Sequence, residues 1–589
     1  MSKRGKPRSG STGAGPPRGN LVRPSRRSLA PPGVLALLTA LVALWTLGYA
    51  DTLRLPFVGD DYFYLDEIRD ASFTSLWTPA NLVSGYFRPW SREFHFWALE
   101  RVFGLEGGLF HVANLALWLA IATLYFTFVR RLTGARTAAI ATAGVAGLAA
   151  WGVLLVWASG SQDLWMLLFA LVYLHACASH RGTWAAAPLA LALLSKESAA
   201  VLPLVALAFH VLWERESPST ALRRTWPSFL VLAAWALVHP SLGGHLWQAT
   251  GTHFNPGPHP PLCWADSARL LAIVNLDRPF DPQGGWGLAL LLGGATALIL
   301  AGFATWGAAA REPGALLGGT ARRRDPGRLV FFGAAWLILG WLPMFMPSLG
   351  WHAYYGLLGA LGAWLAVAAA LASRPRLAVA LVGAVALLRP AHVRTFMDDW
   401  GTEACQRSSA AQVRTLRAEL MRLHPSIPRH SRIYLANLPG GIGLITGPGD
   451  SPTLRTWYAD PTLAAGFFTE YHPRPAGKDG RDYFFAADSD LSLIEFTRGA
   501  GAVSPSLARN PVWQTGENEL ATIFSEQGEW DAALQGFLTL ASLDPGAYDY
   551  ALNAAVCYGR LGDAVSAARW LRRSAALRAS TRRALATGR

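Results

Sequence analysis

Apolar segments separated by short, arginine-bearing loops dominate the chain between residues 33 and 389. They are 34–50, 109–129, 138–157, 164–178, 184–194, 199–213, 226–238, 286–306, 329–345, 353–371 and 377–388. A helix of roughly 20 apolar residues crosses a bilayer, and arginine collects in the loops that stay in the cytoplasm. The pattern predicts a polytopic α-helical membrane protein of about eleven spans with a cytoplasmic N-terminus.

One polar interruption decides the predicted topology. The segment 184–194 is only half a bilayer long, and Ser195-Lys196-Glu197-Ser198 separates it from 199–213. If both segments formed one helix, the later arginine-rich loops would lie outside the cytoplasm, against the usual distribution of positive charge. We therefore expect a break in the helix here. It places these polar residues on one face of the membrane: Asp60, Asp61, Asp163, Lys196, Glu197 and His352.

Three further regions precede, separate or follow the spans. Residues 1–32, rich in Gly, Pro, Ser and Arg, are predicted to form a disordered basic cytoplasmic tail. Residues 51–108 form an external loop of the 33–389 transmembrane domain. Beyond the last span, an amphipathic helix and then strand and turn patterns predict a small α/β domain over 390–510, with the helix at 408–423 and a strand at 431–438. Because the span count is odd, residues 390–589 are expected to be extracytoplasmic.

The last part of the chain, 511–589, repeats with a period of 34 residues. Phe524, Gly528, Ala533 and Phe537 recur as Tyr558, Gly562, Ala567 and Leu571. This spacing is that of tetratricopeptide repeats, which place small residues where paired helices cross and glycine in the turn. The alternative is an ordinary pair of helical hairpins.

Composition and charge narrow the function classes. Hydrophobic residues make up 52% of the 589 residues and charged residues 15%, which excludes an ordinary soluble globular protein. The net charge of +14 comes mostly from loop arginines, so nucleic acid is not expected as a partner. Four scattered cysteines and the lack of a His/Cys cluster predict no metal site. Lys196 is the one lysine among the apolar segments.

An acidic stretch from Phe57 to Asp70 follows the first apolar segment closely. Carboxylates beside a bilayer are costly and usually have a function. The side chains of Asp60 and Asp61 diverge by about 100° on a helix, so one can face a substrate while the other anchors the backbone. Alternatively, one of them only caps a helix that starts at Tyr62.

Several short motifs carry a resemblance to a known family. They are Gly59-Asp60-Asp61, Phe87-Arg88-Pro89-Trp90, Phe103-Gly104-Leu105 with His111 and Asn114, Asp163-Leu164, and Leu194-Ser195-Lys196-Glu197. With the terminal repeats, they resemble GT-C glycosyltransferases of the branch that contains protein O-mannosyltransferases and the repeat-bearing transmembrane mannosyltransferases. The chain departs from that pattern at Ser161, where a basic residue is usual, and at His352, where a longer Arg/Tyr signature is shortened.

The resemblance implies transfer of a sugar, of the hexose or mannose type, from a polyprenyl-phosphate donor to a hydroxyl of a protein, glycan or lipid, without a further cofactor. Asp60 is then the general base of an inverting displacement, with Asp61 as the alternative. Fixed cations stabilise the leaving phosphate. The candidate phosphate ligands are Lys196, Arg88, Arg92 and His352, and the candidate supporting residues are Glu197, Asp163 and His111.

These side chains also have structural interpretations. Lys196 could pair with Glu197 or extend to the membrane interface, and the two arginines could be interfacial anchors. His111 and Asn114 share a helix face, where hydrogen bonds between helices are the more common role. His352 could serve in packing.

A second hypothesis for the whole protein is a non-catalytic membrane scaffold that presents the repeats to a protein partner. Charged residues at membrane depth distinguish the two hypotheses, because a scaffold does not need them. Under the first hypothesis the protein lies in the plasma (inner) membrane, and the repeats offer an acceptor protein a dock beside the acidic stretch.

Overall fold

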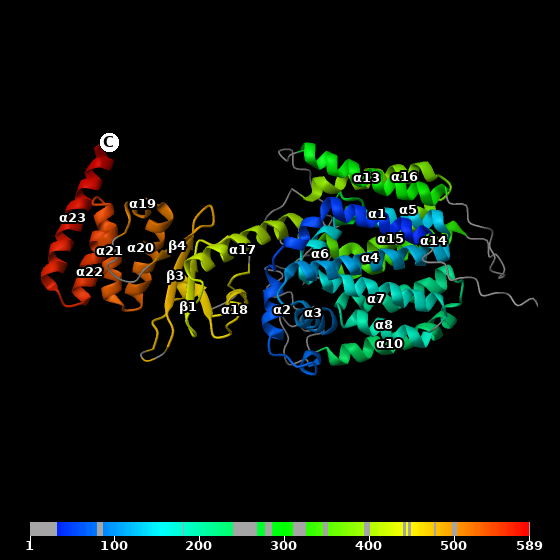
Figure 1. Cartoon of the computed structure of the whole chain (residues 1–589), viewed down its shortest axis with the longest axis horizontal. Coiled ribbons are helices and arrows are strands. Elements are labelled where there is room, and N and C mark those ends of the chain that lie inside the picture. The colour runs from blue at the N-terminus through cyan, green and yellow to red at the C-terminus, as the bar shows by residue number, and fades with distance from the viewer. Residues whose placement is uncertain are drawn as a thin grey trace, which may run out of the picture.

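The computed structural model shows three parts in a row: a helical bundle, a small α/β unit and a set of helical hairpins (Figure 1). The described residues are 32–78, 86–180, 182–239, 268–276, 286–309, 325–345, 352–393, 401–439, 443–445, 449–475, 477, 479–496 and 503–587. The predicted tail, most of the loop after residue 239 and most of the arginine-rich loop 311–328 fall outside them.

Each of the eleven apolar segments is largely helical and belongs to the bundle, but the segment 138–157, expected as one span, is divided into two helices between Ala146 and Trp151. In chain order the bundle helices are α1 (Pro32–Gly48), α4 (Gly107–Leu132), α5 (Ala135–Ala146), α6 (Trp151–Val156), α7 (Ser161–Ala178), α8 (Gly182–Leu193), α9 (Leu202–Ala208), α10 (Pro218–Val238), α13 (Trp286–Ala309), α14 (Pro326–Trp341), α15 (Leu357–Ala370) and α16 (Pro375–Val393). Glycine lets α14 and α15 pack backbone to backbone, since a Cβ added at Gly340 would lie 2.6 Å from the nitrogen of Gly359.

By length and composition, three helices within the described residues can cross a membrane: Gly107–Leu132, Ala158–Ala178 and Ala353–Ala370. Five other apolar helices there are shorter, so the count of eleven spans stays a prediction. The expected break is present. Helix α8 ends at Leu193, and Lys196 has an extended backbone (φ −164°, ψ 141°) before the 3-10 turn η6 (Glu197–Val201).

The external loop folds onto one end of the bundle as α2 (Asp60–Ile68), the 3-10 turn η2 (Ser75–Trp77), the π-turn η4 (Trp90–Phe94) and α3 (His95–Phe103). Helix α2 begins at Asp60, two residues before the position considered from the sequence, and neither aspartate is its N-cap. The N-cap is Gly59, whose φ of +52° is accessible to glycine at little cost.

The α/β unit contains α17 (Glu403–Leu423) and a four-stranded sheet in the order β2-β1-β3-β4. Its strands are β1 (Arg432–Ala436), β2 (Ala464–Phe467), β3 (Asp482–Ala487) and β4 (Leu493–Phe496). Strand β1 runs parallel to both β2 and β3, with α18 (Pro452–Tyr458) in the β1–β2 connection, and β4 is antiparallel to β3. The helix and the strand predicted here are α17 and β1.

The terminal region forms two consecutive helical hairpins, α20 (Pro511–Glu526) with α21 (Trp530–Leu543) and α22 (Tyr548–Arg560) with α23 (Ala564–Thr587). Gly528 and Gly562, 34 positions apart, have φ values of 80° and 85° in the two hairpin turns. The hairpins thus follow the predicted period, and their membership of the tetratricopeptide family stays a prediction.

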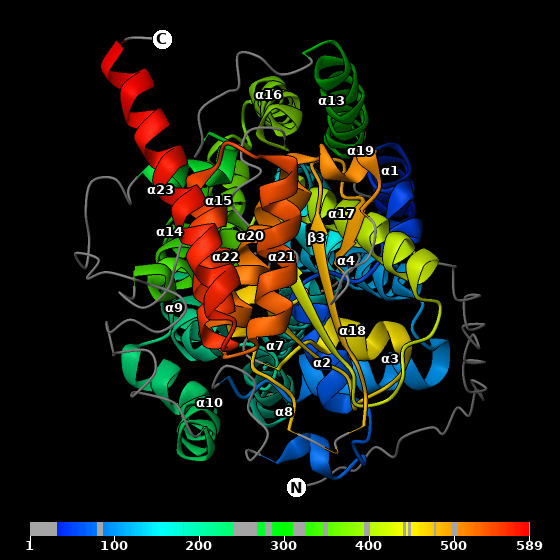
Figure 2. The same ribbon diagram turned by 90° about the vertical axis from the view of Figure 1, so that its left-hand side faces the viewer.

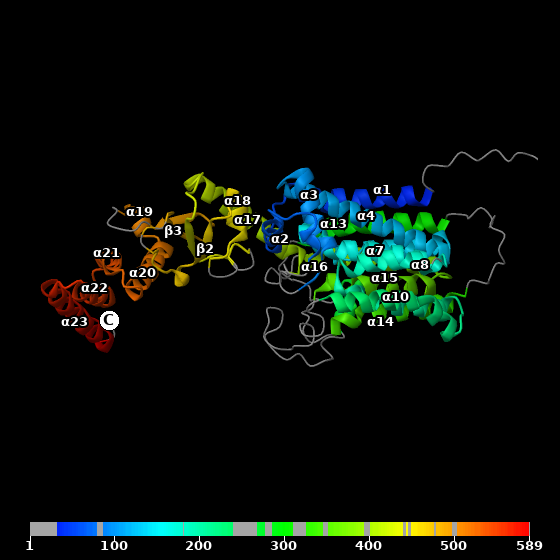
Figure 3. The ribbon, with the colours of Figure 1, turned by 90° about the horizontal axis from the view of Figure 1, so that it is seen from below.

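The hairpins lie at the end of the molecule remote from the bundle, with the α/β unit between them and α2 (Figures 1 and 3). This arrangement differs from the expectation of a repeat surface beside the acidic stretch, because the α/β unit occupies that place. Helix α18 packs directly on α2.

Candidate functional site

Asp61 is fully buried and holds the backbone of the acidic stretch. Its Oδ2 accepts a hydrogen bond from the backbone N–H of Val58 (3.0 Å), and its Oδ1 accepts one from the backbone N–H of Ser159 (2.8 Å) and another from the Ser159 hydroxyl. Burial raises the pKa of Asp61 to about 7, although these hydrogen bonds favour the ionised form. With 0% of its surface exposed, Asp61 ties α2 to the turn before α7.

The turn that holds Asp61 is itself fixed from α4. The Asn114 side-chain amide donates to the carbonyls of Leu154 (3.0 Å), Trp157 (3.0 Å) and Ala158 (3.2 Å), at the end of α6 and in the turn that follows it. Asn114 therefore has the helix–helix role considered from the sequence. His111, one turn earlier on α4, is also buried, with 2% of its surface exposed.

Asp60 differs from its neighbour, because its side chain is exposed to solvent. The surrounding protein raises its pKa, while the guanidinium groups of Arg92 and then Arg88 lower it. The two arginines are joined by a backbone hydrogen bond from the Arg92 N–H to the Arg88 carbonyl (3.2 Å), so they lie one turn apart, as expected. An accessible carboxylate thus lies within the electrostatic range of two fixed cations.

Both arginines have carboxylate partners. Arg88 Nε lies 3.0 and 2.9 Å from the two Glu197 oxygens, and a terminal nitrogen lies 2.6 Å from Glu197 Oε2. Another terminal nitrogen donates to Gln162 Oε1 (2.7 Å). Arg92 Nε donates to Glu93 Oε1 (2.7 Å). These pairs fix the guanidinium planes rather than leaving them as flexible interfacial anchors.

Lys196 pairs with Asp163, not with Glu197 as the structural interpretation supposed. Its Nζ lies 2.6 Å from Asp163 Oδ2 and 4.2 Å from the ring centroid of Tyr355. The Tyr355 ring packs edge-on against His352, which is 7% exposed. Burial lowers the pKa of Lys196, and the Asp163 carboxylate opposes that effect. The short motif at 352–355 therefore forms one wall around the ammonium group.

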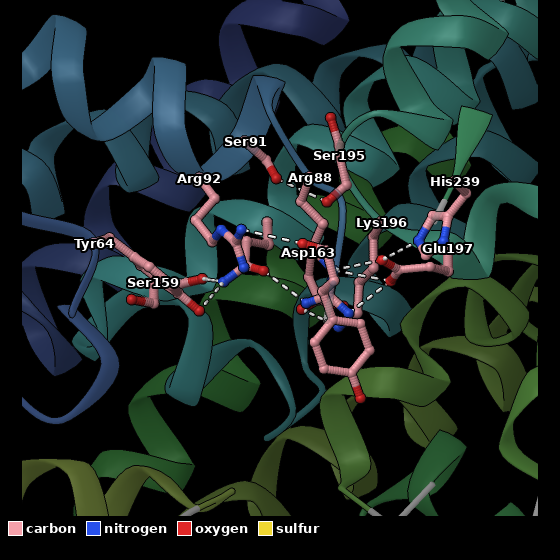
Figure 4. Close-up of polar contacts among 12 residues, drawn as sticks. Tyr64, Arg88, Ser91, Arg92, Ser159, Asp163, Ser195, Lys196, Glu197 and His239 are labelled. Atoms are coloured by element: carbon pink, nitrogen blue, oxygen red, sulfur yellow. Dashed lines mark hydrogen bonds and ion pairs between the residues drawn. The ribbon is translucent and has the colours of Figure 1, made fainter. Parts of the chain in front are cut away.

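Serine hydroxyls join these elements (Figure 4). Ser91 donates to the Ser195 carbonyl (2.7 Å) in the break after α8, and Ser161 donates to the Ser91 carbonyl (3.1 Å). The position where the resembled family has a basic residue is thus a buried structural hydroxyl here. Figure 4 also places His239 next to Glu197, with Nε2 3.7 Å from Oε1.

The C-terminal part of the chain reaches α2 through α18. Trp457 Nε1 donates to the Tyr62 hydroxyl (3.0 Å), and Arg455 Nε lies 2.9 Å from Asp66 Oδ2. A Cβ added at Gly443 would lie 2.7 Å from the Cα of Gly59. These contacts lie on the face of α2 that carries residues 59, 62 and 66. Asp60 and Tyr64 are one helical turn apart and lie on a different face.

Sequence reasoning missed several of these partners: Ser159, Gln162, His239, Arg455 and Trp457. The polar Ser159–Gln162 turn between two apolar segments was a usable signal, because polar side chains there need buried partners. No comparable signal marked Arg455. Among the described residues, no group of three or more His, Cys, Asp or Glu side chains could hold a metal ion.

Comparison with known proteins finds weak structural likeness only. No family model matches the sequence, and no curated protein matches it. Two solved structures match 73% of this chain and 85% of theirs: ArnT from Cupriavidus metallidurans bound to undecaprenyl phosphate (18% identity, TM-score 0.35) and the same protein in the apo state (17%, 0.34). Because both TM-scores are low, nothing about the fold or the site is inferred from them.

Proposed function

We propose that this chain is a GT-C-type membrane glycosyltransferase that moves a sugar from a polyprenyl-phosphate donor to a hydroxyl acceptor. The observation that carries the proposal is the division of labour in the acidic pair. Asp61 is locked into backbone hydrogen bonds, and Asp60 is exposed within the field of two arginines, the buried Arg92 and the partly buried Arg88. A scaffold needs no such arrangement.

Asp60 is the general base of this proposal. An attacking hydroxyl must lose its proton as it bonds to the anomeric carbon, and an exposed carboxylate with a raised pKa accepts that proton more readily than an ordinary aspartate. Asp61 positions this base through Val58 and Ser159 and does not touch the acceptor. A single displacement by one acceptor oxygen inverts the configuration at the anomeric carbon.

The cations serve the leaving phosphate. Negative charge grows on the phosphate oxygen as the glycosidic bond breaks, and preorganised positive groups stabilise it in the transition state. Lys196 supplies a point charge held by Asp163 and Tyr355, and Arg88 supplies a planar guanidinium. Since Glu197 occupies one edge of Arg88 and Gln162 accepts from its other terminal nitrogen, the phosphate binds at Lys196, and Arg88 contributes mainly through its positive charge. Arg92 acts from further away, through the field at Asp60.

The finer assignment follows the sequence resemblance. The sugar is of the hexose or mannose type, the acceptor hydroxyl belongs to a protein, glycan or lipid, and the reaction occurs at the extracytoplasmic face of the plasma membrane. In this topology the α/β unit and the hairpins share the compartment of Asp60.

The test is transfer of radiolabelled sugar from polyprenyl-phosphate donors in membranes that carry Asp60→Asn, Asp61→Asn or both. We expect Asp60→Asn to lower the rate about 100-fold or more at unchanged donor affinity, as for loss of a general base. Thr74→Ala, an exposed change in the same loop, is the matched control. Full activity of Asp60→Asn would rule the assignment out, whatever the activity of Asp61→Asn.

The scaffold hypothesis makes the opposite prediction. If purified protein binds no polyprenyl-phosphate sugar while a partner co-purifies through residues 513–589, the scaffold function is the correct one. The buried Lys196–Asp163 pair and the partly buried Arg88–Glu197 pair argue against it, because removing ion pairs from water costs free energy and a scaffold does not need them.

A further inference from the structure

The terminal hairpins carry their charges in two separate blocks. Residues 511–550 contain seven acidic residues and no basic one, whereas residues 551–589 contain eight arginines and a single acid, Asp563. The first block covers α20 and α21, and the second covers most of α22 and all of α23. Charge segregation of this degree inside one small helical module indicates an interaction surface rather than a uniformly solvated one.

The outer face of α23 is unpartnered. Ser574, which is buried, donates to the Tyr548 carbonyl of α22 (2.9 Å) and so marks the packed face. On the opposite face lie Val565, 82% exposed, and the exposed Arg569 and Arg572, with alanines at 568, 576 and 579 between the charges. Small residues between arginines make a flat surface that another polypeptide can approach closely.

Helix α23 is also longer than the helix that supports it. It spans 24 residues against 13 for α22, and its C-terminal half projects past the other hairpin helices (Figure 2). An overhanging helix gains little from packing within its own chain, although tertiary packing is the usual source of helix stability in proteins.

The complementary surface lies on the same module. Glu526 at the end of α20 and Asp531 at the start of α21 are exposed beside the Gly528 turn. Within the described part of the chain, neither these acids nor Arg569 and Arg572 form an ion pair, although Arg569 does lower the pKa of nearby Asp563. One copy therefore presents an exposed basic face and an exposed acidic turn at different places.

We propose that α23 of one copy docks on the acidic α20–α21 turn of a second copy. The interface is heterologous, so each copy has one donor and one acceptor surface and association can continue beyond a dimer. The molecule's own bilayer is a poor alternative occupant, because the α/β unit separates the hairpins from the bundle (Figures 1 and 3).

The test uses the full-length chain in nanodiscs that hold one copy each, with disc association measured by mass photometry. We expect association at about 50 mM salt that weakens markedly at about 500 mM, where screening acts within a few ångström. Arg569→Glu with Arg572→Glu, and separately Glu526→Arg with Asp531→Arg, should each weaken association about tenfold or more. Arg509→Glu, an exposed change outside the hairpins, should leave it unchanged.

The decisive measurement is an equimolar mixture of the two charge-reversed variants. Their reversed faces complement each other, so association should return toward the wild-type level, which also shows that both variants are folded. The neutral pair Arg569→Gln with Arg572→Gln should be weakened as well, without added negative charge. Wild-type discs that stay single at low salt, variants that associate like wild type, or a mixture that fails to recover would each overturn the proposal. Binding of α23 to anionic vesicles without self-association would assign the face to lipid instead.

Discussion

Replacing Asp61 by asparagine should destabilise the acidic stretch rather than remove a proton acceptor. Both Asp61 oxygens accept from backbone N–H groups, Val58 on one side and Ser159 on the other. An asparagine amide has one oxygen and one NH2 group, so in either orientation it directs a donor at a buried donor. Leaving one such group unpaired costs about 2–3 kcal/mol. Asp60→Asn, at an exposed position, should change the free energy of unfolding by less than about 0.5 kcal/mol.

The pH dependence sharpens this prediction. Burial raises the folded-state pKa of Asp61 to about 7, above its ordinary value of 3.8. The folded state therefore binds the proton more tightly, and the stability contributed by Asp61 is fully present below about pH 4 and lost as the pH rises through about 7. An asparagine does not titrate, so the difference between wild type and Asp61→Asn should be largest at pH 5 and smaller at pH 8.

The assay is SDS-titration unfolding in mixed micelles at both pH values, followed by sugar transfer at a temperature where each variant is folded. We expect Asp61→Asn to lose stability and to keep part of its activity, and Asp60→Asn to show the reverse. An Asp61→Asn protein as stable as wild type at pH 5 would refute the hydrogen-bonding scheme. Equal stability losses in both variants would refute the distinction between an anchoring and an exposed aspartate.

Three further predictions concern the same site. The acid limb of the transfer rate should have an apparent pKa above that of an ordinary aspartate, because the protein around the exposed Asp60 side chain raises its pKa against its arginine neighbours. A pH–rate profile measures this pKa, and an acid limb below pH 4 would contradict the prediction. Lys196→Met should lower the free energy of unfolding by about 3–5 kcal/mol, because it leaves the Asp163 carboxylate buried and unpaired. Adding Asp163→Asn to the Lys196→Met variant should restore stability but not sugar transfer. Gly443→Ala should lower the rate of transfer, because a φ of +64° is strained for alanine and the added Cβ would meet the backbone of Gly59, next to Asp60. Gly449→Ala is the control, since Gly449 has a similar φ of +74° but no neighbouring atom within 4 Å of an added Cβ. Equal activity in both variants would contradict the proposed contact.

The local sequence pattern was enough to predict the helical segments and the division of the chain into regions. Every apolar segment is largely helical, and the break before Lys196 lies where Ser195 and the charges after it interrupt the hydrophobic run. The period of 34 residues located both hairpin turns at Gly528 and Gly562. These features depend on burial periodicity and on backbone freedom, which neighbouring residues in the sequence determine.

Charge pairing was decided by the tertiary structure alone. Adjacent residues suggested Lys196 with Glu197, yet Lys196 turns to Asp163 and Glu197 to Arg88. Consecutive side chains leave an extended or 3-10 backbone in different directions, so each one meets a different helix. The packing of the bundle decides which helix each side chain meets. A sequence pattern shows only on which face of its own helix or strand a residue lies.

The two neighbouring aspartates show the same limit. Sequence reasoning predicted that one would face a ligand and the other the backbone, but it left open which was which. The choice depends on Ser159, 98 positions away, whose N–H and hydroxyl meet Asp61 because Asn114 holds the preceding carbonyls. Arg455, 389 positions from Asp66, adds a contact that no local signal marks. Hydrogen-bond partners that distant are brought together only by the packing of helices and of the α/β unit, and that packing makes Asp60 the exposed carboxylate.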